Sequence, residues 1–148
     1  MNWEQIVGQE NLKTLLRDSI ANNRVSHAQL FIGKEGYGTL PLAMAFAKEI
    51  FRKENEHSSS KVEHLNHLDL HFSFPVFKEK SSGLSDNFLE NFREMILANP
   101  YANNEDWTKI LESENKQLTI YADEVDELNK KFSLKSFYHI YFLFQLLN

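Results

Sequence analysis

The chain has 148 residues, of which 42% are hydrophobic and 13% aromatic, so it carries enough apolar material for one buried core. Sixteen basic residues against 21 acidic ones give a net charge of −5, which argues against strong DNA binding by the isolated chain. The sequence has no cysteine, and this excludes disulfides and every metal site built on thiolates.

The N-terminal region predicts a helix followed by a strand. Polar residues interrupt any apolar run at the start, so no targeting segment is visible and a cytoplasmic location is expected. Apolar side chains then recur at helical spacing: Leu12, Leu15, Leu16 and Ile20. Residues 28–32, Ala-Gln-Leu-Phe-Ile, are typical of a short buried strand.

Residues 33–40 carry the glycines of a phosphate-binding loop without its two ligand-binding side chains. The glycines are Gly33, Gly36 and Gly38. In the pattern G-x-x-x-x-G-K-[ST], Thr39 stands at the lysine position and Leu40 at the position of the hydroxyl that binds magnesium. The apolar spacing from residue 40 to residue 51 predicts a helix directly after the loop. The order of strand, loop and helix favours a vestigial nucleotide-binding loop over a chance glycine-rich turn.

The middle of the chain contains closely spaced histidines but predicts no metal site. His64, His67 and His71 would share one face of a helix, yet residues 69–77 alternate in the manner of a strand. Strand periodicity separates the imidazoles, so we expect no bound metal. Pro75 lacks an N–H donor, which places this strand at a sheet edge or at its end.

The second half predicts alternating helices and strands. A helix capped by Ser85 or Asp86 ends before Pro100, and a short helix capped by Asn104 follows. Trp107 and Leu111 are expected to be the buried side of that short helix. Residues 118–121 read as a strand.

The last predicted helix carries an apolar stripe of Val125, Leu128 and Phe132. We expect ion pairs between residues four apart on its other face: Asp126 with Lys130, and Glu127 with Lys131. Residues 137–147 form an almost unbroken apolar run, shorter than the roughly 20 residues that span a membrane. This run predicts a central strand buried on both faces, whose edge would promote association between copies if left unpaired.

Several stretches resemble the AAA+ clamp-loader subunits, and in particular the delta-prime branch of the bacterial DNA polymerase III clamp loader. They are residues 3–9, 24–31, 67–72, 99–101 and 114–117, and the likeness extends from Met1 to about Phe137. The resemblance implies an α/β fold, namely an incomplete P-loop AAA+ domain with a mostly parallel sheet flanked by helices. The phosphate-binding loop is commonly degenerate in that branch, in agreement with Thr39 and Leu40.

The resemblance also carries expectations about domains and sites. It implies that residues 1–148 form a single truncated AAA+ P-loop domain without the lid and collar domains, and without the four-cysteine zinc module of many members. Val7, Gly8 and Gln9 correspond to the adenine-facing region of active relatives, where a vestigial pocket would lie. The alternative for these three residues is a turn that positions the first helix.

The function implied is that of a non-catalytic clamp-loader subunit that supports sliding-clamp loading in DNA replication. We expect no cofactor, no metal and no intrinsic ATPase activity. The expected partners are the clamp-loader ATPase subunits and the delta subunit, with DNA reached only through the assembly and no contact with a membrane. Two alternatives stay open: an active P-loop nucleotide hydrolase with an unconventional loop, and a truncated product without independent function.

Overall fold

A computed structural model describes residues 2–26, 28–34, 36–55, 57–78, 82–113, 115–133 and 140–143. The chain divides into two compact units, which are treated separately here. The first unit comprises Met1–His67 with Asn99–Tyr101, and the second comprises Leu68–Ala98 with Ala102–Asn148. No helix within the described ranges is long and apolar enough to cross a lipid bilayer.

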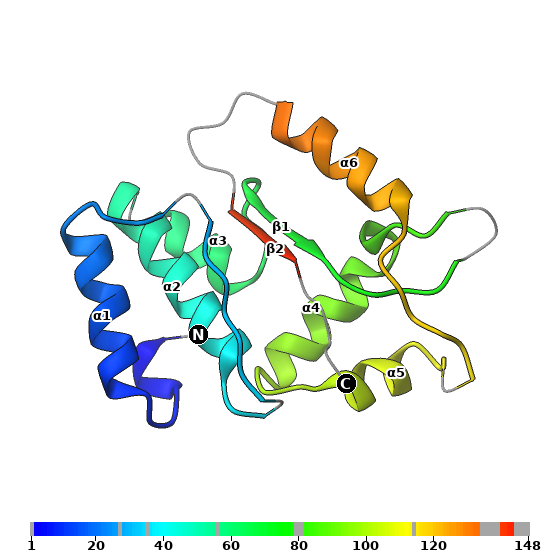
Figure 1. Cartoon of the computed structure of the whole chain (residues 1–148), viewed down its shortest axis with the longest axis horizontal. Helices are drawn as coiled ribbons and strands as arrows, with labels where there is room; N and C mark the ends of the chain where they lie inside the picture. The colour runs from blue at the N-terminus through cyan, green and yellow to red at the C-terminus, as the bar shows by residue number, and fades with distance from the viewer. Residues whose placement is uncertain are drawn as a thin grey trace. The chain divides into compact units, whose positions relative to one another are not determined.

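The first unit is helical (Figure 1). Its elements are the 3-10 turn η1 (Trp3–Gln5) and the helices α1 (Glu10–Ala21), α2 (Thr39–Glu54) and α3 (Ser58–Glu63). The helices predicted on either side of residues 33–38 are therefore confirmed. Their shared core consists of apolar residues from η1, α1 and α2: Trp3, Ile6, Leu16, Ile20, Leu42, Ala45 and Phe46.

Lysine side chains anchor both ends of α1. Lys13 is buried, and its Nζ donates to the backbone oxygen of Ile6 at 2.6 Å and to Glu10 Oε1 at 2.7 Å. At the other end, Lys53 of α2 donates to the backbone oxygen of Ile20. The Ile20 carbonyl already accepts from the N–H of Asn23 at 3.1 Å, so Lys53 adds a second, charged donor to it. The Lys13 bond joins α1 to the turn before it, and the Lys53 bond joins the last turn of α2 to the last turn of α1.

The ion pair of Lys48 with Glu63 connects α2 to α3, with Nζ and Oε1 3.0 Å apart. The hydrogen bond from Lys48 lowers the pKa of the Glu63 carboxyl, and burial opposes this effect. Because the Glu63 side chain is 45% exposed, solvent screens the pair, and its contribution to stability is small.

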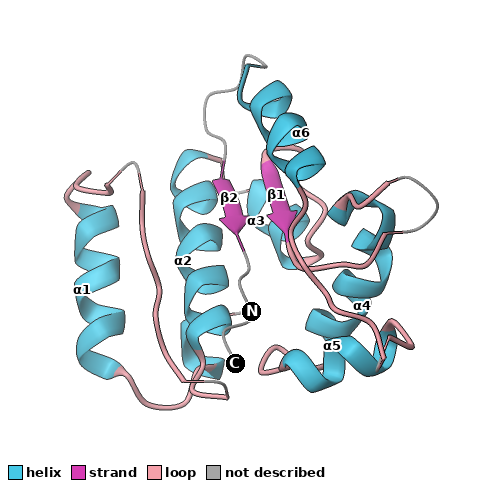
Figure 2. Cartoon of the chain, turned by 45° about the vertical axis from the view of Figure 1, so that its right-hand side comes forward, coloured by secondary structure: helices cyan, strands magenta, loops and turns pink. Residues whose placement is uncertain are grey.

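The strand expected at residues 28–32 is not present. This segment runs as an extended loop beside α1 and α2 (Figure 2). Phe31 packs against Phe46 with ring centroids 5.9 Å apart, whereas Leu30 and Ile32 are 83% and 76% exposed. A strand requires a hydrogen-bonded neighbour, and β1 and β2, the strands within the described ranges, pair with each other instead. Apolar alternation alone therefore did not determine the structure here.

The second unit combines a short parallel strand pair with helices. Its elements are β1 (Leu70–Ser73), η2 (Ser85–Phe88), α4 (Leu89–Ala98), α5 (Asn104–Ile110), α6 (Ala122–Ser133) and β2 (Ile140–Leu143). β1 and β2 are parallel, with Leu70 opposite Ile140 and Ser73 opposite Leu143. The predicted strand in the apolar run of residues 137–147 is thus confirmed over β2, and the rest of that run lies outside the described residues.

β1 is shorter than the alternating pattern predicted, because it ends before Pro75. Val76 continues as an isolated antiparallel bridge to Thr119, which is all that the structure shows of the strand expected at residues 118–121. The bridge carries two backbone bonds of 3.0 Å each and joins the chain after β1 to the chain before α6.

An aromatic cluster forms the core of the second unit. Phe74 stacks on Phe92 with ring centroids 4.2 Å apart, and Trp107 meets both rings edge-on at 5.1 and 5.7 Å. The indole Nε1 of Trp107 donates to the backbone oxygen of Pro75 at 2.8 Å. Such edge-to-face pairs contribute roughly 0.5–1.5 kcal/mol beyond the burial of their area. The predicted burial of Trp107 and Leu111 is confirmed.

Two helix caps differ from the prediction. α5 is capped by Asn103 and not by Asn104: the Asn103 side chain accepts from the backbone of Asp106, and the Asp106 side chain accepts in return. This reciprocal capping box satisfies two N–H groups at once, and an Asn104 cap offers no such exchange. The N-cap residue before α4 is Leu84, because the helical segment begins with the 3-10 turn η2 at Ser85. The Ser85 hydroxyl does not cap this turn; it accepts from the N–H of Phe74 and donates to the Phe74 oxygen.

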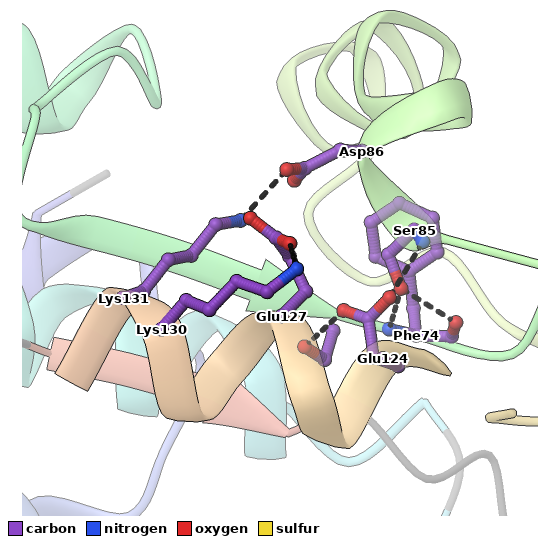
Figure 3. Close-up of polar contacts among 8 residues, drawn as sticks. Phe74, Ser85, Asp86, Glu124, Glu127, Lys130 and Lys131 are labelled. Atoms are coloured by element: carbon purple, nitrogen blue, oxygen red, sulfur yellow. Dashed lines mark hydrogen bonds and ion pairs between the residues drawn. The ribbon is translucent and has the colours of Figure 1, made fainter. Parts of the chain in front are cut away.

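α6 turns a polar face inward, against the prediction. Glu124 is 4% exposed, and it accepts from Ser73 Oγ at 2.5 Å and from the backbone N–H of Ser85 at 2.8 Å (Figure 3). Two turns further on, Lys131 donates to Asp86 at 2.7 Å. Of the expected stripe, Val125 and Phe132 are 52% and 56% exposed, and Leu128 is half-buried.

The expected ion pairs along α6 also differ. Glu127 pairs with Lys130, three residues away at 3.2 Å, because Lys131 is engaged with Asp86. Specific hydrogen bonds from fixed partners at both ends of the helix thus outweigh burial of the apolar stripe.

We predict that Glu124→Ala lowers the free energy of unfolding by about 1–3 kcal/mol, because it leaves the buried N–H of Ser85 without its acceptor. Urea unfolding followed by circular dichroism measures this loss. Glu127→Ala on the same helix removes only the solvent-screened pair with Lys130, so the change should stay within about 1 kcal/mol. Equal losses in the two variants would contradict the role assigned to Glu124.

Candidate functional site

Two glycines of the loop adopt a left-handed backbone. Gly36 and Gly38 have φ angles of 76° and 83°, in the left-handed region that favours glycine. The N–H of Tyr37 donates to the Lys34 oxygen at 3.1 Å, which closes a turn inside the loop. Gly38 is the N-cap residue of α2, and its oxygen accepts from the N–H of Leu42 at 3.0 Å. The loop therefore leads directly into a helix N-terminus.

The side chain at the expected lysine position folds back across this loop. A Cβ atom at Gly33 would lie 2.2 Å from Thr39 Oγ1, far inside contact distance. The two ends of the loop thus meet, with the Thr39 hydroxyl in the space that any side chain at residue 33 would need. Leu40, at the expected hydroxyl position, is 6% exposed and belongs to the apolar interior. Neither position presents a group for a phosphate or a magnesium ion.

The start of α2 retains a weak electropositive character. The first N–H groups of a helix have no intrahelical acceptors and attract anions. Pro41 reduces their number, since it lacks an N–H. The first turn of α2 carries no acidic side chain, so nothing in that turn repels an anion. This arrangement could hold a phosphate oxygen weakly, and it supplies no catalytic group.

Residues 7–9 form the turn that begins α1. Gly8 and Gln9 both have positive φ angles, 69° and 61°, and Gln9 is the N-cap residue of α1. The Gln9 oxygen accepts from the Lys13 N–H at 2.9 Å. Val7 is 84% exposed, and its backbone N–H donates to Tyr101 Oη at 3.1 Å. This geometry supports the turn interpretation of these residues.

Tyr101 was not among the residues singled out for a site. It lies 94 positions from its hydrogen-bond partner Val7, and no periodicity or spacing in the sequence connects them. Its ring also packs against the loop: a Cβ at Gly38 would lie 3.1 Å from Tyr101 Cε1. The structure thus brings Val7 and Gly38, one residue from each predicted segment, to one tyrosine.

The histidines have structural surroundings. The His67 ring packs against Phe51 with centroids 4.2 Å apart and the planes tilted by 35°, His64 is the C-cap residue of α3, and His71 lies on β1. Within the ranges that the structure describes, no group of three or more histidine, aspartate or glutamate side chains could hold a metal ion.

The comparisons with known proteins agree on one family. A family model described as "DNA polymerase III, delta subunit" matches residues 8–142. The DNA polymerase III subunit delta' of Bacillus subtilis (strain 168) is 31% identical over 113 residues, which amount to 66% of this chain and 34% of that relative. The chain thus spans about a third of the length of this relative. No solved structure is significantly similar to the chain.

The family match includes Gly8, the glycine loop and Tyr101, whereas Val7 precedes it. The chain belongs to the DNA polymerase III delta subunit family and resembles its delta-prime, clamp-loader type.

Proposed function

We propose that the chain is a non-catalytic, delta-prime-like part of a clamp loader that supports sliding-clamp loading in DNA replication. The observation that carries this proposal is the side-chain arrangement of the loop. Thr39 turns back toward Gly33 and Leu40 is buried, so the loop keeps its path without its ligand groups. Residues 33–40 are then a degenerate Walker A segment in an AAA+ P-loop domain with a mostly parallel sheet, and a replication role places the protein in the cytoplasm.

Physical chemistry makes ATP hydrolysis by this loop implausible. Phosphoryl transfer depends on the lysine at the phosphates and on a hydroxyl at the magnesium ion acting together. A charge-assisted hydrogen bond contributes roughly 1.5–3 kcal/mol, so each lost contact lowers affinity on the order of ten- to a hundredfold. Backbone amides at the start of α2 cannot compensate, since Pro41 removes one of them. The partners with ATPase activity would supply the chemistry.

The charge of the chain fits a role at DNA through partners. With a net charge of −5, the chain would repel the phosphate backbone on its own. The ATPase subunits and the delta subunit are the proposed partners, and the assembly would contribute the positive surface for DNA.

We predict that the chain shows no binding of Mg-ATP in the low micromolar range and no turnover. Isothermal titration calorimetry measures the first, and phosphate release measures the second. The physical reason is the missing lysine and hydroxyl at Thr39 and Leu40. Tight binding or turnover that is abolished by Gly38→Val would favour the alternative, an active hydrolase with an unconventional loop.

We predict weak, concentration-dependent association with the clamp-loader ATPase and delta subunits of the same organism. The aligned region is 34% of the delta-prime relative, so we expect it to carry only part of the contacts of such a subunit. Sedimentation velocity of the mixture, compared with each component alone, detects the complex. The absence of any mixed species at tens of micromolar would contradict a role in this assembly. The double variant Val125→Asp, Phe132→Asp tests whether these two exposed apolar side chains of α6 contribute to the association.

A further inference from the structure

We propose that Tyr101 is an internal cover of the degenerate loop, which takes the place of a nucleotide as the bridge between the turn at residues 7–9 and the start of α2. The inference rests on the proposed function, in which this loop takes no nucleotide of its own. It concerns a residue outside the phosphate-binding pattern, and its position is defined by contacts in the first unit alone.

Tyr101 reaches both halves of the site at once. Its hydroxyl accepts from the N–H of Val7 at 3.1 Å, and its ring edge lies where a Cβ at Gly38 would be only 3.1 Å away. Gly38 is buried although the neighbouring Tyr37 is 66% exposed. One side chain therefore extends from the turn at residues 7–9 to Gly38, the residue just before α2. By the resemblance, the base of a nucleotide would lie near the first of these segments and its phosphates near the second.

A local turn holds the tyrosine in this position. α4 ends at Ala98, and the side-chain oxygen of Asn99 accepts from the N–H of Tyr101 at 3.0 Å. Pro100 between them has a fixed φ angle and restricts the turn further. The three residues Asn99–Tyr101 belong to the first unit, whereas the chain on both sides of them belongs to the second. The ring is thus presented by a constrained backbone.

The Tyr101 ring obstructs the one feature of the loop that still favours an anion, the N-terminal amides of α2. The N-terminal amides of α2 attract anions, and an anion must approach them to within hydrogen-bond distance. A ring in contact with Gly38 occupies the approach at that residue, while Thr39 fills the inner side near Gly33. A ligand would have to displace the Tyr101 ring and break its bond to Val7. The approach at Gly38 is therefore obstructed by packing, in addition to the loss of the lysine from the loop.

The test restores the lysine and then removes the cover. Thr39→Lys is prepared alone, with Tyr101→Ala and with Tyr121→Phe, a tyrosine of the second unit, as the control, and the affinity for Mg-ATP is measured by calorimetry. Addition of Tyr101→Ala should tighten binding about tenfold, because the ligand no longer displaces a hydrogen-bonded ring, and Tyr121→Phe should leave it unchanged. No gain on addition of Tyr101→Ala, including no binding by either variant, would overturn the proposal.

A second measurement needs no ligand and no restored lysine. In Tyr101→Phe the ring remains and the hydroxyl is lost, so hydrogen exchange at the Val7 amide should accelerate about two- to tenfold. Tyr37→Phe should leave that amide as it is. An unchanged exchange rate of the Val7 amide in Tyr101→Phe would overturn the proposal that Tyr101 covers the loop.

The two proposals fail in different ways. Tight Mg-ATP binding by the unaltered chain would defeat the proposed function itself. If the unaltered chain does not bind Mg-ATP, and neither Tyr101 variant changes the affinity or the exchange at Val7, only the proposal that Tyr101 covers the loop is contradicted.

Discussion

The first unit depends on the burial of α2 along its first two turns. Leu40 and every residue from Leu42 to Ala47 are at most 6% exposed, so the start of this helix cannot rotate or shift without exposing core side chains. With α2 fixed, the direction of Thr39 is also fixed, and its hydroxyl points back toward Gly33. The position that would bind magnesium in a working loop is here part of the core. The loss of ligand chemistry is therefore built into the packing of the unit.

The same packing explains why the glycines are needed without a ligand. Gly33 has no room for a side chain because Thr39 lies against it, and Gly38 combines a positive φ angle with the nearby ring of Tyr101. A glycine pattern in a sequence thus reports the shape of a loop, whereas the lysine and hydroxyl report its chemistry. In this chain the glycines are present and the lysine and hydroxyl are not, so the two signals separate.

Local patterns predicted most helices and failed where long-range partners decide. The spacing of apolar residues gave α1, α2 and the burial of Trp107, since burial of one helix face is a local property. It could not give the state of residues 28–32, because a strand depends on a neighbour distant in sequence. It also misjudged α6, where Ser73 and Ser85 draw Glu124 inward from 51 and 39 positions away. Tyr101 was missed for the same reason: its partner Val7 is 94 positions distant.

The contrast between Glu124 and Tyr101 shows how polar groups connect distant segments in the two units. Glu124 bonds to the end of β1 and to the start of η2, so a single carboxylate ties α6 to both. Tyr101 does the same for the N-terminal turn and the glycine loop, with its hydroxyl and the edge of its ring. In a nucleotide-binding protein, a ligand bridges such segments and leaves when it is hydrolysed or exchanged. A side chain is not exchanged in this way, so a loop bridged by its own tyrosine stays in one state, in keeping with the non-catalytic role that we propose.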